Sequence, residues 1–546
     1  MKTITIKLLD YCHYIFFIIF TIIGFFIYKD YGFNIDETFT RKSGFYWLIF
    51  LSDFFNLNEI SEIASAKLNT SDDFTIPWSD AYGIIFDVPA AIIEILFSIN
   101  EPLKVYQMRH LLTFFYFLFG TIFFYKILVN RFNNKFLSLL GCFLLIITPR
   151  IFGEIFHNSK DVVFLSLFII SIFFYFKTVD DENYKNLILF ALFSSFATST
   201  RIFGCLIPLT FIFIYFISVL SQKEDLKKLK NIIIYIFFYL LFLYLHWPYL
   251  WEEPLISFFK YINNLNIFGP NMVYFLGKYY NTELVPYSYL PIWILISTPV
   301  LNLILFFLGL YFASRFFLTK LFFLDVNKSK YDFWNIDGEK KDFFTLVLLI
   351  SFIVGGTFFS IKHYNSWRIF YFLNFFIIYF SIYFINNYLL SSKLKKYFKY
   401  FLLILIFSIS LNIKSLIVYH PYQGLFFNNL ISKKFKKKFE ADFTGLSGIE
   451  FLRKIVKNET KPKIYIGVNS WYPLWRMKEL LPDKDKKRII FVYNEIDNAD
   501  YVYSNKIYNI NAAKSKKYKL SDNFKFYEEL VIDNLVVYEV FKRIEK

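Results

Sequence analysis

Acidic and basic side chains gather in a few short segments of this chain, each next to a long apolar run. Charged groups at the edge of the hydrocarbon layer of a membrane are costly, so they usually pair with one another or bind a charged ligand. The residues concerned are Asp36 and Glu37, Lys160 and Asp161, Arg201, and His363 with Arg368.

The chemistry of these residues fits an anchored phosphate. Arginine offers a planar fork for phosphate oxygens and lysine a point charge, so Lys160, Arg201 and Arg368 are the expected phosphate ligands, with His363 beside them. A carboxylate next to a sugar phosphate ester can act as general base and remove a proton from an acceptor hydroxyl that attacks the anomeric carbon. The departing phosphate would then be stabilised by the basic residues.

The composition indicates a polytopic α-helical membrane protein. The 546 residues are 56% hydrophobic, with 76 Phe and 42 Tyr, and the mean hydropathy is +0.43, whereas soluble proteins are about 45–50% apolar. Runs of nearly 20 apolar residues are needed to cross about 30 Å of hydrocarbon. About eleven such runs occur, near residues 11–28, 109–128, 136–153, 162–176, 187–200, 203–220, 231–247, 289–312, 343–361, 369–386 and 399–417.

The distribution of lysine and arginine predicts the orientation. Basic residues cluster at 222–230, 314–342 and 393–399, which places these loops and the N-terminus in the cytoplasm. The first apolar run is long and lacks a small-residue cleavage site, so we expect an uncleaved anchor. All the chemically interesting residues then fall on the outer side of the cytoplasmic membrane.

Three parts of the chain are expected outside the membrane-spanning helices. The first loop, 29–108, contains the apolar segments 45–55 and 82–99, which we interpret as helices lying in the membrane interface. A second loop, 248–288, is rich in Gly, Pro and Asn, as binding loops often are. From residue 420 the pattern changes to short strands and helices, which divides the chain into a transmembrane domain, 1–419, and a small outside α/β domain, 420–546. The expected strands are 463–468, 488–494, 499–505, 524–532 and 534–541, with helices at 447–458 and 470–481.

Other classes of function find little support. The net charge of +16 follows from the membrane topology and a Lys-rich C-terminal segment, so no nucleic-acid partner is expected. The three cysteines have no disulfide or metal-ligand spacing. Neither a nucleotide-binding loop nor a zinc-hydrolase motif is found, and no internal repeat suggests an inverted-repeat transporter.

The segments "PRIFGEIFHNSKDVVF", "WPYLWEEP", "NSWRIFYF", "HPYQGLFFNN" and "FEADFTGLSGIEFL", together with the Asp-Glu pair of the first loop, resemble a known family. The chain looks like a bacterial member of the C superfamily of integral-membrane glycosyltransferases, in the branch of protein O-mannosyltransferases and aminoarabinose transferases. The resemblance implies a lipid-phosphate sugar as donor. It also implies that Asp36 is the catalytic base supported by Glu37, that Asp161 is the second acid, and that Lys160, Arg201 and Arg368 bind phosphate.

The resemblance has limits at the C-terminus, where the α/β segment stands in place of the β-trefoil domain of the mannosyltransferases. A protein acceptor is therefore in doubt. No cofactor is predicted, although a divalent ion bridged by Asp36 and Asp161 is an alternative, as in some members of the superfamily. Structural interpretations also compete: a helix-start pair at Lys160–Asp161, an ion pair between Arg201 and Glu154, and headgroup contacts of Arg368 and His363.

The sequence thus predicts an inverting hexosyl or pentosyl transferase. It would move one sugar from a polyprenyl-phosphate carrier to a lipid, glycan or protein acceptor outside the membrane, among membrane lipids. The alternatives are a transporter or flippase of lipid-linked sugars, which needs ionisable residues along a path through both halves of the membrane, and a noncatalytic scaffold.

Overall fold

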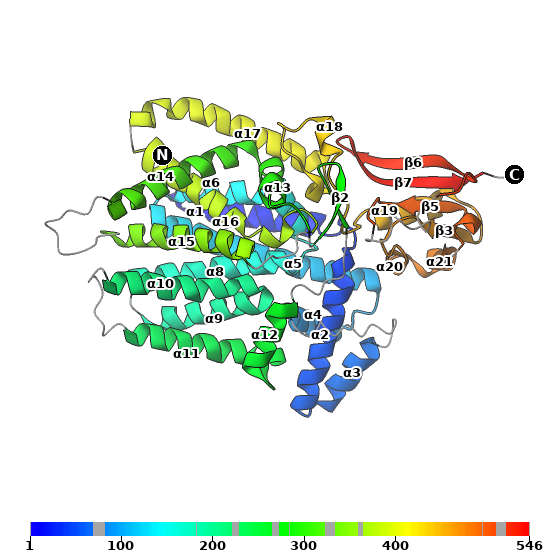
Figure 1. The fold of residues 1–546 in the computed structure, drawn as a ribbon, viewed down its shortest axis with the longest axis horizontal. Coiled ribbons are helices and arrows are strands. Elements are labelled where there is room, and N and C mark those ends of the chain that lie inside the picture. Colours follow the sequence, from blue (N-terminus) through cyan, green and yellow to red (C-terminus); the bar gives the residue numbers. More distant parts are fainter. Residues whose placement is uncertain are drawn as a thin grey trace.

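The chain folds into an elongated bundle of helices with the start of α1 toward one end and the C-terminal domain at the other (Figure 1). The architecture comes from a computed structural model. It describes residues 2–68, 82–181, 183–220, 229–264, 272–282, 284–322, 334–358, 364–391, 393–493, 495–508 and 520–544.

Each of the eleven apolar runs expected from the sequence overlaps a helix of this bundle. The helices are α1 (Lys2–Ile27), α5 (Pro102–Phe132), α6 (Lys135–Ile146), α8 (Asp161–Asp180), α9 (Tyr184–Thr200), α10 (Leu206–Leu220), α11 (Leu229–Leu245), α14 (Val300–Phe322), α15 (Asp337–Phe358), α16 (Leu373–Phe384) and α17 (Phe398–Val418).

Among the described residues, fewer than eleven helices are long enough to cross the membrane. Among the described residues, five helices are long and apolar enough to cross by themselves, and further apolar helices are shorter. The polytopic membrane class is supported, but the count of eleven spans is not confirmed. The five are Pro102–Phe132, Asp161–Asp180, Ile202–Val219, Val300–Phe322 and Leu394–Val418.

Prolines explain where the helices depart from the apolar runs. The run 289–312 is divided into α13 (Tyr289–Ser297) and α14, because Thr298 precedes Pro299 and takes an extended backbone. The residue before a proline avoids the helical region for steric reasons. Thr148 before Pro149 likewise separates α6 from the short helix α7 (Pro149–Glu154). Because of this second break, α7 and the residues that follow it line the functional site described below.

Helices α2 (Ile35–Phe54), α3 (Asn58–Leu68) and α4 (Asp87–Leu96) lie together at one end of the bundle, and α2 runs across the direction of the spanning helices (Figure 1). Their exposed apolar side chains suit the interfacial position expected from the sequence. The acids of α4 point inward, since Asp87 pairs with Arg109 at 2.5 Å and Glu94 pairs with Arg41 at 2.5 Å. Exposed apolar residues of this unit are Phe54, Phe55, Leu57, Ile60, Ile63, Leu96 and Phe97.

The second loop begins with the 3-10 turn at Pro248–Leu250 and helix α12 (Pro254–Asn264), and continues with a hairpin of β1 (Met272–Phe275) and β2 (Lys278–Asn281). The hairpin is fastened to the segment before the C-terminal domain. The Gly277 N–H donates to the Lys438 carbonyl at 2.8 Å, and the Glu440 N–H donates to the Tyr274 carbonyl at 2.9 Å. Two distant parts of the chain thus form one surface at this end of the bundle.

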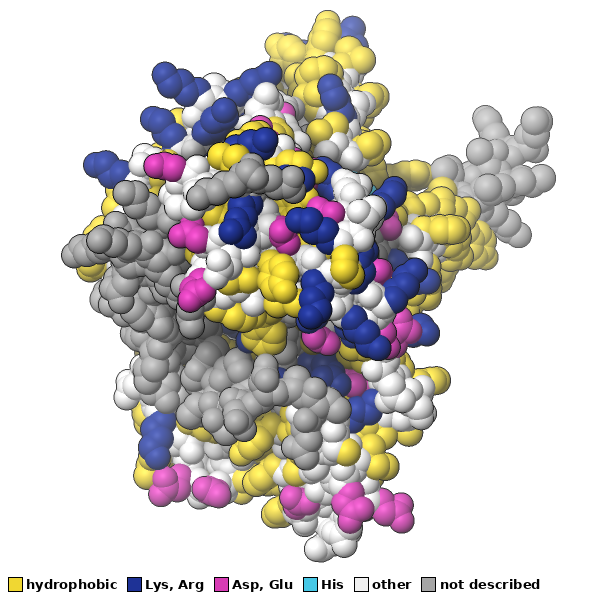
Figure 2. Space-filling model, turned by 90° about the vertical axis from the view of Figure 1, so that its right-hand side faces the viewer, with side chains coloured by type: hydrophobic (Ala, Val, Ile, Leu, Met, Phe, Trp, Pro, Cys, Tyr) yellow, Lys and Arg dark blue, Asp and Glu magenta, His cyan; other side chains and the backbone are white. Residues whose placement is uncertain are grey.

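The C-terminal part of the chain contains a five-stranded sheet in the order β4-β3-β5-β7-β6, as the short strands of the sequence predict. Parallel pairing joins β3 to β4 and to β5, and antiparallel pairing joins β5 to β7 and β7 to β6. The strands are β3 (Ile464–Val468), β4 (Ile489–Val492), β5 (Tyr501–Ser504), β6 (Phe524–Ile532) and β7 (Leu535–Arg543), with helices α19 (Gly448–Asn458), α20 (Trp475–Lys478) and α21 (Asp483–Lys486). The helix expected at 470–481 is reduced to the four residues of α20. Lysine and arginine side chains, interspersed with acids, are spread over the outer face of this end of the molecule (Figure 2).

Close packing of α14 on α16 gives a test of the fold. A Cβ atom at Gly309 would lie 1.9 Å from the backbone oxygen of Phe380, so even alanine is too large there. We expect Gly309→Ala to lower the thermal unfolding midpoint in detergent, since overpacking costs about 1–3 kcal/mol. The exposed neighbour Leu308 provides the control, because Leu308→Ala should leave the midpoint nearly unchanged. An unaltered midpoint for Gly309→Ala would contradict this packing.

Candidate active site

The first turn of α2 presents Asp36 through a capping box. The Asn34 side chain accepts a hydrogen bond from the Asp36 N–H at 2.9 Å, and the Glu37 carboxylate accepts one from the Asn34 N–H at 2.8 Å. Such reciprocal bonds satisfy N–H groups that a helix start leaves unpaired. The residues Asn34 to Glu37 therefore contain the capping interactions that begin α2. As neighbours on a helix, Asp36 and Glu37 point in different directions.

The two adjacent acids have different environments. The Glu37 side chain is buried, and its second oxygen lies 3.0 Å from Nε2 of His110. The Asp36 side chain is 42% exposed and pairs with Arg368. The geometry therefore leaves Asp36 as the accessible acid, whereas Glu37 holds the helix start.

An alternating row of charges connects Asp36 to α9. The Nη2 atom of Arg368 lies 2.6 Å from Asp36, and the Nε atom of the same guanidinium lies 3.8 Å from Asp161. Asp161 in turn accepts a hydrogen bond from Nη2 of Arg201 at 2.5 Å. Four residues from four separate segments thus form one ion-pair row, Asp36–Arg368–Asp161–Arg201. The proposed pair between Arg201 and Glu154 is not formed; Asp161 takes that place.

The charges in this row shift the pKa values of their neighbours. The partial burial of Asp36 by itself would raise its pKa, but the positive charge of Arg368, helped by that of Lys160, outweighs this effect and lowers the pKa below the ordinary value. Burial would lower the pKa of Arg201, yet Asp161 outweighs that effect and raises it. Asp36 is therefore ionised at neutral pH while it faces Arg368.

Lys160 occupies a different setting from the two arginines. Its ammonium lies over aromatic rings, 3.5 Å from the ring centre of Tyr82 and 4.4 Å from that of Phe39. Burial, together with the positive charge of Arg201, lowers the pKa of Lys160 to about 7. The cation–π contacts hold the ammonium in place, and its charge changes close to physiological pH.

Asn158 organises the start of α8. Its side-chain oxygen accepts the Asp161 N–H at 3.0 Å, and its amide donates to Asp161 at 3.0 Å and to Glu154 at 2.9 Å. His157 next to it accepts a hydrogen bond from the Asn34 amide at 3.2 Å. Burial, followed by the neighbouring His110, lowers the pKa of His157 to about 3, so the ring is neutral.

Five of the seven residues singled out in the sequence as chemically active meet in this cluster: Asp36, Lys160, Asp161, Arg201 and Arg368. A small cavity opens between Asp36, Lys160, Asp161 and Arg201, and Arg368 reaches it through its ion pair with Asp36. The cavity is lined also by Asn34, Glu37, Thr40, His157, Asn158 and Ser159. Glu37 borders the cavity, while His363 lies outside the described residues. Sequence reasoning missed the roles of Asn34, Asn158 and His110. For Asn158, the signal in the sequence was an asparagine three residues before a helix-start acid.

A divalent ion between Asp36 and Asp161 is the alternative that the sequence leaves open. Among the described residues, no group of three or more His, Cys, Asp or Glu side chains is arranged to hold one. Between Asp36 and Asp161, where a bridging ion was considered, the guanidinium of Arg368 contacts both carboxylates. The guanidinium of Arg368 therefore occupies the position between the two carboxylates.

Comparisons with known proteins give the following results. No protein-family model matches the chain, and no curated protein matches it in sequence. Among solved structures, it is similar to ArnT from Cupriavidus metallidurans bound to undecaprenyl phosphate, with a TM-score of 0.46 and 10% identity, covering 97% of this chain and 98% of that chain. The apo state of the same protein is matched with a TM-score of 0.42 and 9% identity over the same shares.

The ion-pair row predicts a strong coupling between Asp161 and Arg201. Asp161 is buried and Arg201 is largely buried. Replacing Asp161 by Asn leaves Arg201 without its carboxylate, and loss of one partner of a buried pair typically costs about 3–5 kcal/mol. The double variant Asp161→Asn/Arg201→Gln should lose clearly less than the sum of the two single variants, as a double-mutant cycle of unfolding free energies would measure. Additive losses would mean that the pair is not formed.

Proposed function

We propose that the chain is an inverting glycosyltransferase that moves one sugar from a polyprenyl-phosphate carrier to an acceptor outside the cytoplasmic membrane. The observation that carries this proposal is the cluster of Lys160, Arg201 and Arg368 around Asp36 and Asp161, at one end of an apolar helix bundle. The apolar bundle suits a lipid carrier, and the cations suit the phosphate of that carrier. Asp36 supplies the base that the transfer needs.

Open hydrogen-bond donors in the cluster support an anionic ligand. The Nε atoms of Arg201 and Arg368 are buried and donate no hydrogen bond to any of the described residues. A buried donor without an acceptor is costly, and most such groups in native proteins have partners. Phosphate oxygens would satisfy both guanidinium groups, which present the planar fork that suits them.

The proposed transfer uses Asp36 as general base. Its carboxylate takes the proton of an acceptor hydroxyl while that oxygen forms a bond to the anomeric carbon. The bond from the anomeric carbon to the phosphate oxygen breaks, and polyprenyl phosphate leaves with the electron pair. Lys160, Arg201 and Arg368 stabilise the charge that develops on the leaving oxygen. Attack opposite to the leaving group inverts the anomeric centre.

The ion pair between Asp36 and Arg368 provides a natural coupling between donor binding and base strength. In the ligand-free protein the guanidinium lowers the pKa of Asp36 and so weakens it as a base. A phosphate that engages Arg368 would weaken this pair and let the pKa of Asp36 rise toward its ordinary value. The base would thus become stronger only when the donor is in place.

A transporter of lipid-linked sugars fits the arrangement less well. Charged pairs also occur at the opposite end of the bundle, where Arg131 binds Asp342 at 2.5 Å and Lys341 binds Asp180. Between the two ends, however, α8 is apolar and buried from Val162 to Leu165 and from Leu167 to Ile170. On α8, no ionisable side chain occurs between Val162 and Phe174, so this helix does not link the charges at its two ends.

The direct test follows release of free polyprenyl phosphate from a panel of radiolabelled polyprenyl-phosphate sugars by the purified protein in lipid. Asp36→Asn should reduce release about 100-fold or more, because general-base catalysis contributes about 10²–10⁴ in rate. Asp30→Asn is the matched control, since Asp30 is an exposed acid nearby that pairs with His420. Donor binding by both proteins with release by neither, even with candidate acceptors present, would favour the transporter.

The pH dependence of donor binding tests the role of Lys160. Because the pKa of Lys160 in the free protein is about 7, its ammonium is charged below that pH and loses its charge as pH rises. The phosphodiester of the donor and the carboxylate of Asp36 keep their charge in this window. KM for the donor should therefore rise severalfold between about pH 6 and pH 9, and Lys160→Arg should flatten this profile. An unchanged slope in that variant would exclude Lys160 as the titrating group.

A further inference from the structure

The backbone makes an unusual turn just before Arg368. Asn365 and Ser366 are consecutive residues with a left-handed backbone, at φ values of 51° and 58°. Residues other than glycine rarely adopt this conformation, because their Cβ atom lies too close to the following carbonyl oxygen. They keep it only where surrounding contacts hold them. The turn at Asn365–Ser366 therefore needs a contact that stabilises it.

This turn brings together the side chains that flank it. The ring centre of Tyr364, just before the turn, lies 5.0 Å from the guanidinium carbon of Arg368, just after it. Arg368 begins a short 3-10 helix, and its guanidinium reaches both Asp36 and Asp161. The direction from which Arg368 enters the charge cluster is therefore set by the two left-handed residues.

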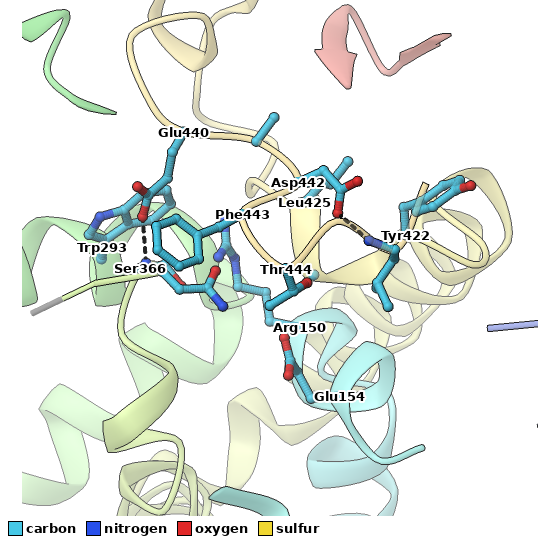
Figure 3. Close-up of a pocket in the computed structure, with 14 residues that line it drawn as sticks. Arg150, Glu154, Trp293, Ser366, Tyr422, Leu425, Glu440, Asp442, Phe443 and Thr444 are labelled. Atoms are coloured by element: carbon cyan, nitrogen blue, oxygen red, sulfur yellow. Dashed lines mark hydrogen bonds between the residues drawn. The ribbon is translucent and has the colours of Figure 1, made fainter. Parts of the chain in front are cut away.

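The carboxylate of Glu440 lies against the turn. Its Oε1 atom accepts a hydrogen bond from the Ser366 N–H at 2.8 Å, which is the dashed line between these residues in Figure 3. The same atom accepts a hydrogen bond from the Tyr289 hydroxyl of α13 at 3.2 Å. Glu440 is only 8% exposed, and hydrogen bonds to a carboxylate are strong where little water competes. Glu440 is thus placed to offset the cost of the left-handed backbone at Ser366.

Glu440 is itself held by segments outside the charge cluster. Its N–H donates to the Tyr274 carbonyl of β1. The ring of Phe439, next to it, packs on Trp293 of α13 and on Phe275 of β1, with ring centres 5.0 Å and 5.6 Å apart. The position of the Glu440 carboxylate is therefore fixed by α13 and by the hairpin of the second loop.

A different contact fixes the residue between the turn and Arg368. The indole N–H of Trp367 donates to the Ser297 hydroxyl of α13 at 2.8 Å, and Trp367 is buried. This bond holds a side chain and leaves the backbone of the turn free to rotate. Glu440 binds the backbone N–H of Ser366 itself, so it acts directly on the left-handed conformation.

We propose that Glu440 is a positioning residue, whose carboxylate holds the Asn365–Ser366 turn and thereby keeps the Arg368 guanidinium between Asp36 and Asp161. The proposal rests on the proposed function, in which Arg368 binds the phosphate of the donor. Glu440 acts through Arg368 and makes no contact with the phosphate. The segment that leads into the C-terminal domain thus controls a phosphate ligand that lies in another part of the chain.

Arginine-specific labelling of the full-length protein in lipid nanodiscs tests the proposal without any substrate. Phenylglyoxal modifies accessible guanidinium groups, and mass spectrometry gives the rate at each arginine. The Arg368 side chain is only 5% exposed in the native protein. In Glu440→Ala it should be labelled about tenfold faster or more, because a hydrogen bond to a charged group is lost. Arg131, paired with Asp342 at the opposite end of the bundle, is the internal control and should keep its rate. An unchanged rate at Arg368, or an equal acceleration at Arg131, would overturn the proposal.

Two further variants test whether Glu440 acts through the turn. Burial raises the pKa of Glu440 to about 7, so a neutral side chain with the same oxygen acceptor is a close substitute. Glu440→Gln should therefore keep the labelling rate of Arg368 near the native value. Glycine adopts the left-handed conformation without steric cost, so Ser366→Gly combined with Glu440→Ala should label Arg368 about threefold more slowly than Glu440→Ala alone. Acceleration by Glu440→Gln equal to that by Glu440→Ala, or no slowing by Ser366→Gly, would contradict the proposal.

Binding of farnesyl phosphate, a short prenyl phosphate, separates this proposal from the proposed function. Calorimetry in detergent should show about tenfold weaker binding by Glu440→Ala than by the native protein. In the Arg368→Gln background, Glu440→Ala should add no further loss, since Glu440 acts through Arg368. Equal losses in both backgrounds would overturn the proposal. If the native protein binds no farnesyl phosphate, the proposed phosphate site is contradicted, while faster labelling of Arg368 in Glu440→Ala would still support the positioning role.

Discussion

The pairing of Arg368 with Asp36 and Asp161 is the interaction on which the rest of this site depends. Each of these charges is held near the end of an apolar bundle, where a single unpaired charge would be costly. The row Asp36–Arg368–Asp161–Arg201 ties together the start of α2, the start of α8, the end of α9 and the turn before α16. These segments can approach one another because positive and negative charges alternate along the row. The two acids and two arginines of the row balance, so the positive charge of Lys160 makes the cluster suited to an anion.

The C-terminal domain takes part in positioning this row. The Ile35 N–H, just before Asp36, donates to the Thr444 carbonyl at 3.1 Å. Phe33 packs in one core with residues of α19 and β3. At Gly32 the chain approaches the Leu446 carbonyl so closely that a Cβ would lie 2.1 Å from it. The sequence left the role of this domain open. The contacts show that the domain packs against residues 32–35, where α2 begins.

The segments that resemble the glycosyltransferase family gather around a second cavity, whose lining includes Arg150, Glu154 and Glu440. Four of the five quoted segments, those around Glu154, Ser366, Gly424 and Glu440, contribute to its lining. The fifth, "WPYLWEEP", does not. The charge cluster and the second cavity are therefore two parts of one region, built from segments that are far apart in the sequence and joined through Asn158.

The sequence by itself determined the helices, the strands of the C-terminal domain and the identity of the charged residues, because hydropathy, proline positions and capping residues act over a few neighbouring residues. Asp36, Lys160, Asp161, Arg201 and Arg368 were found in this way, and the structure places them together. Only the tertiary structure decided that Arg201 pairs with Asp161 rather than Glu154, and that Glu37 is buried next to His110. Pairing between distant segments depends on how whole helices pack. A pattern of neighbouring residues contains no information on which distant side chains come together.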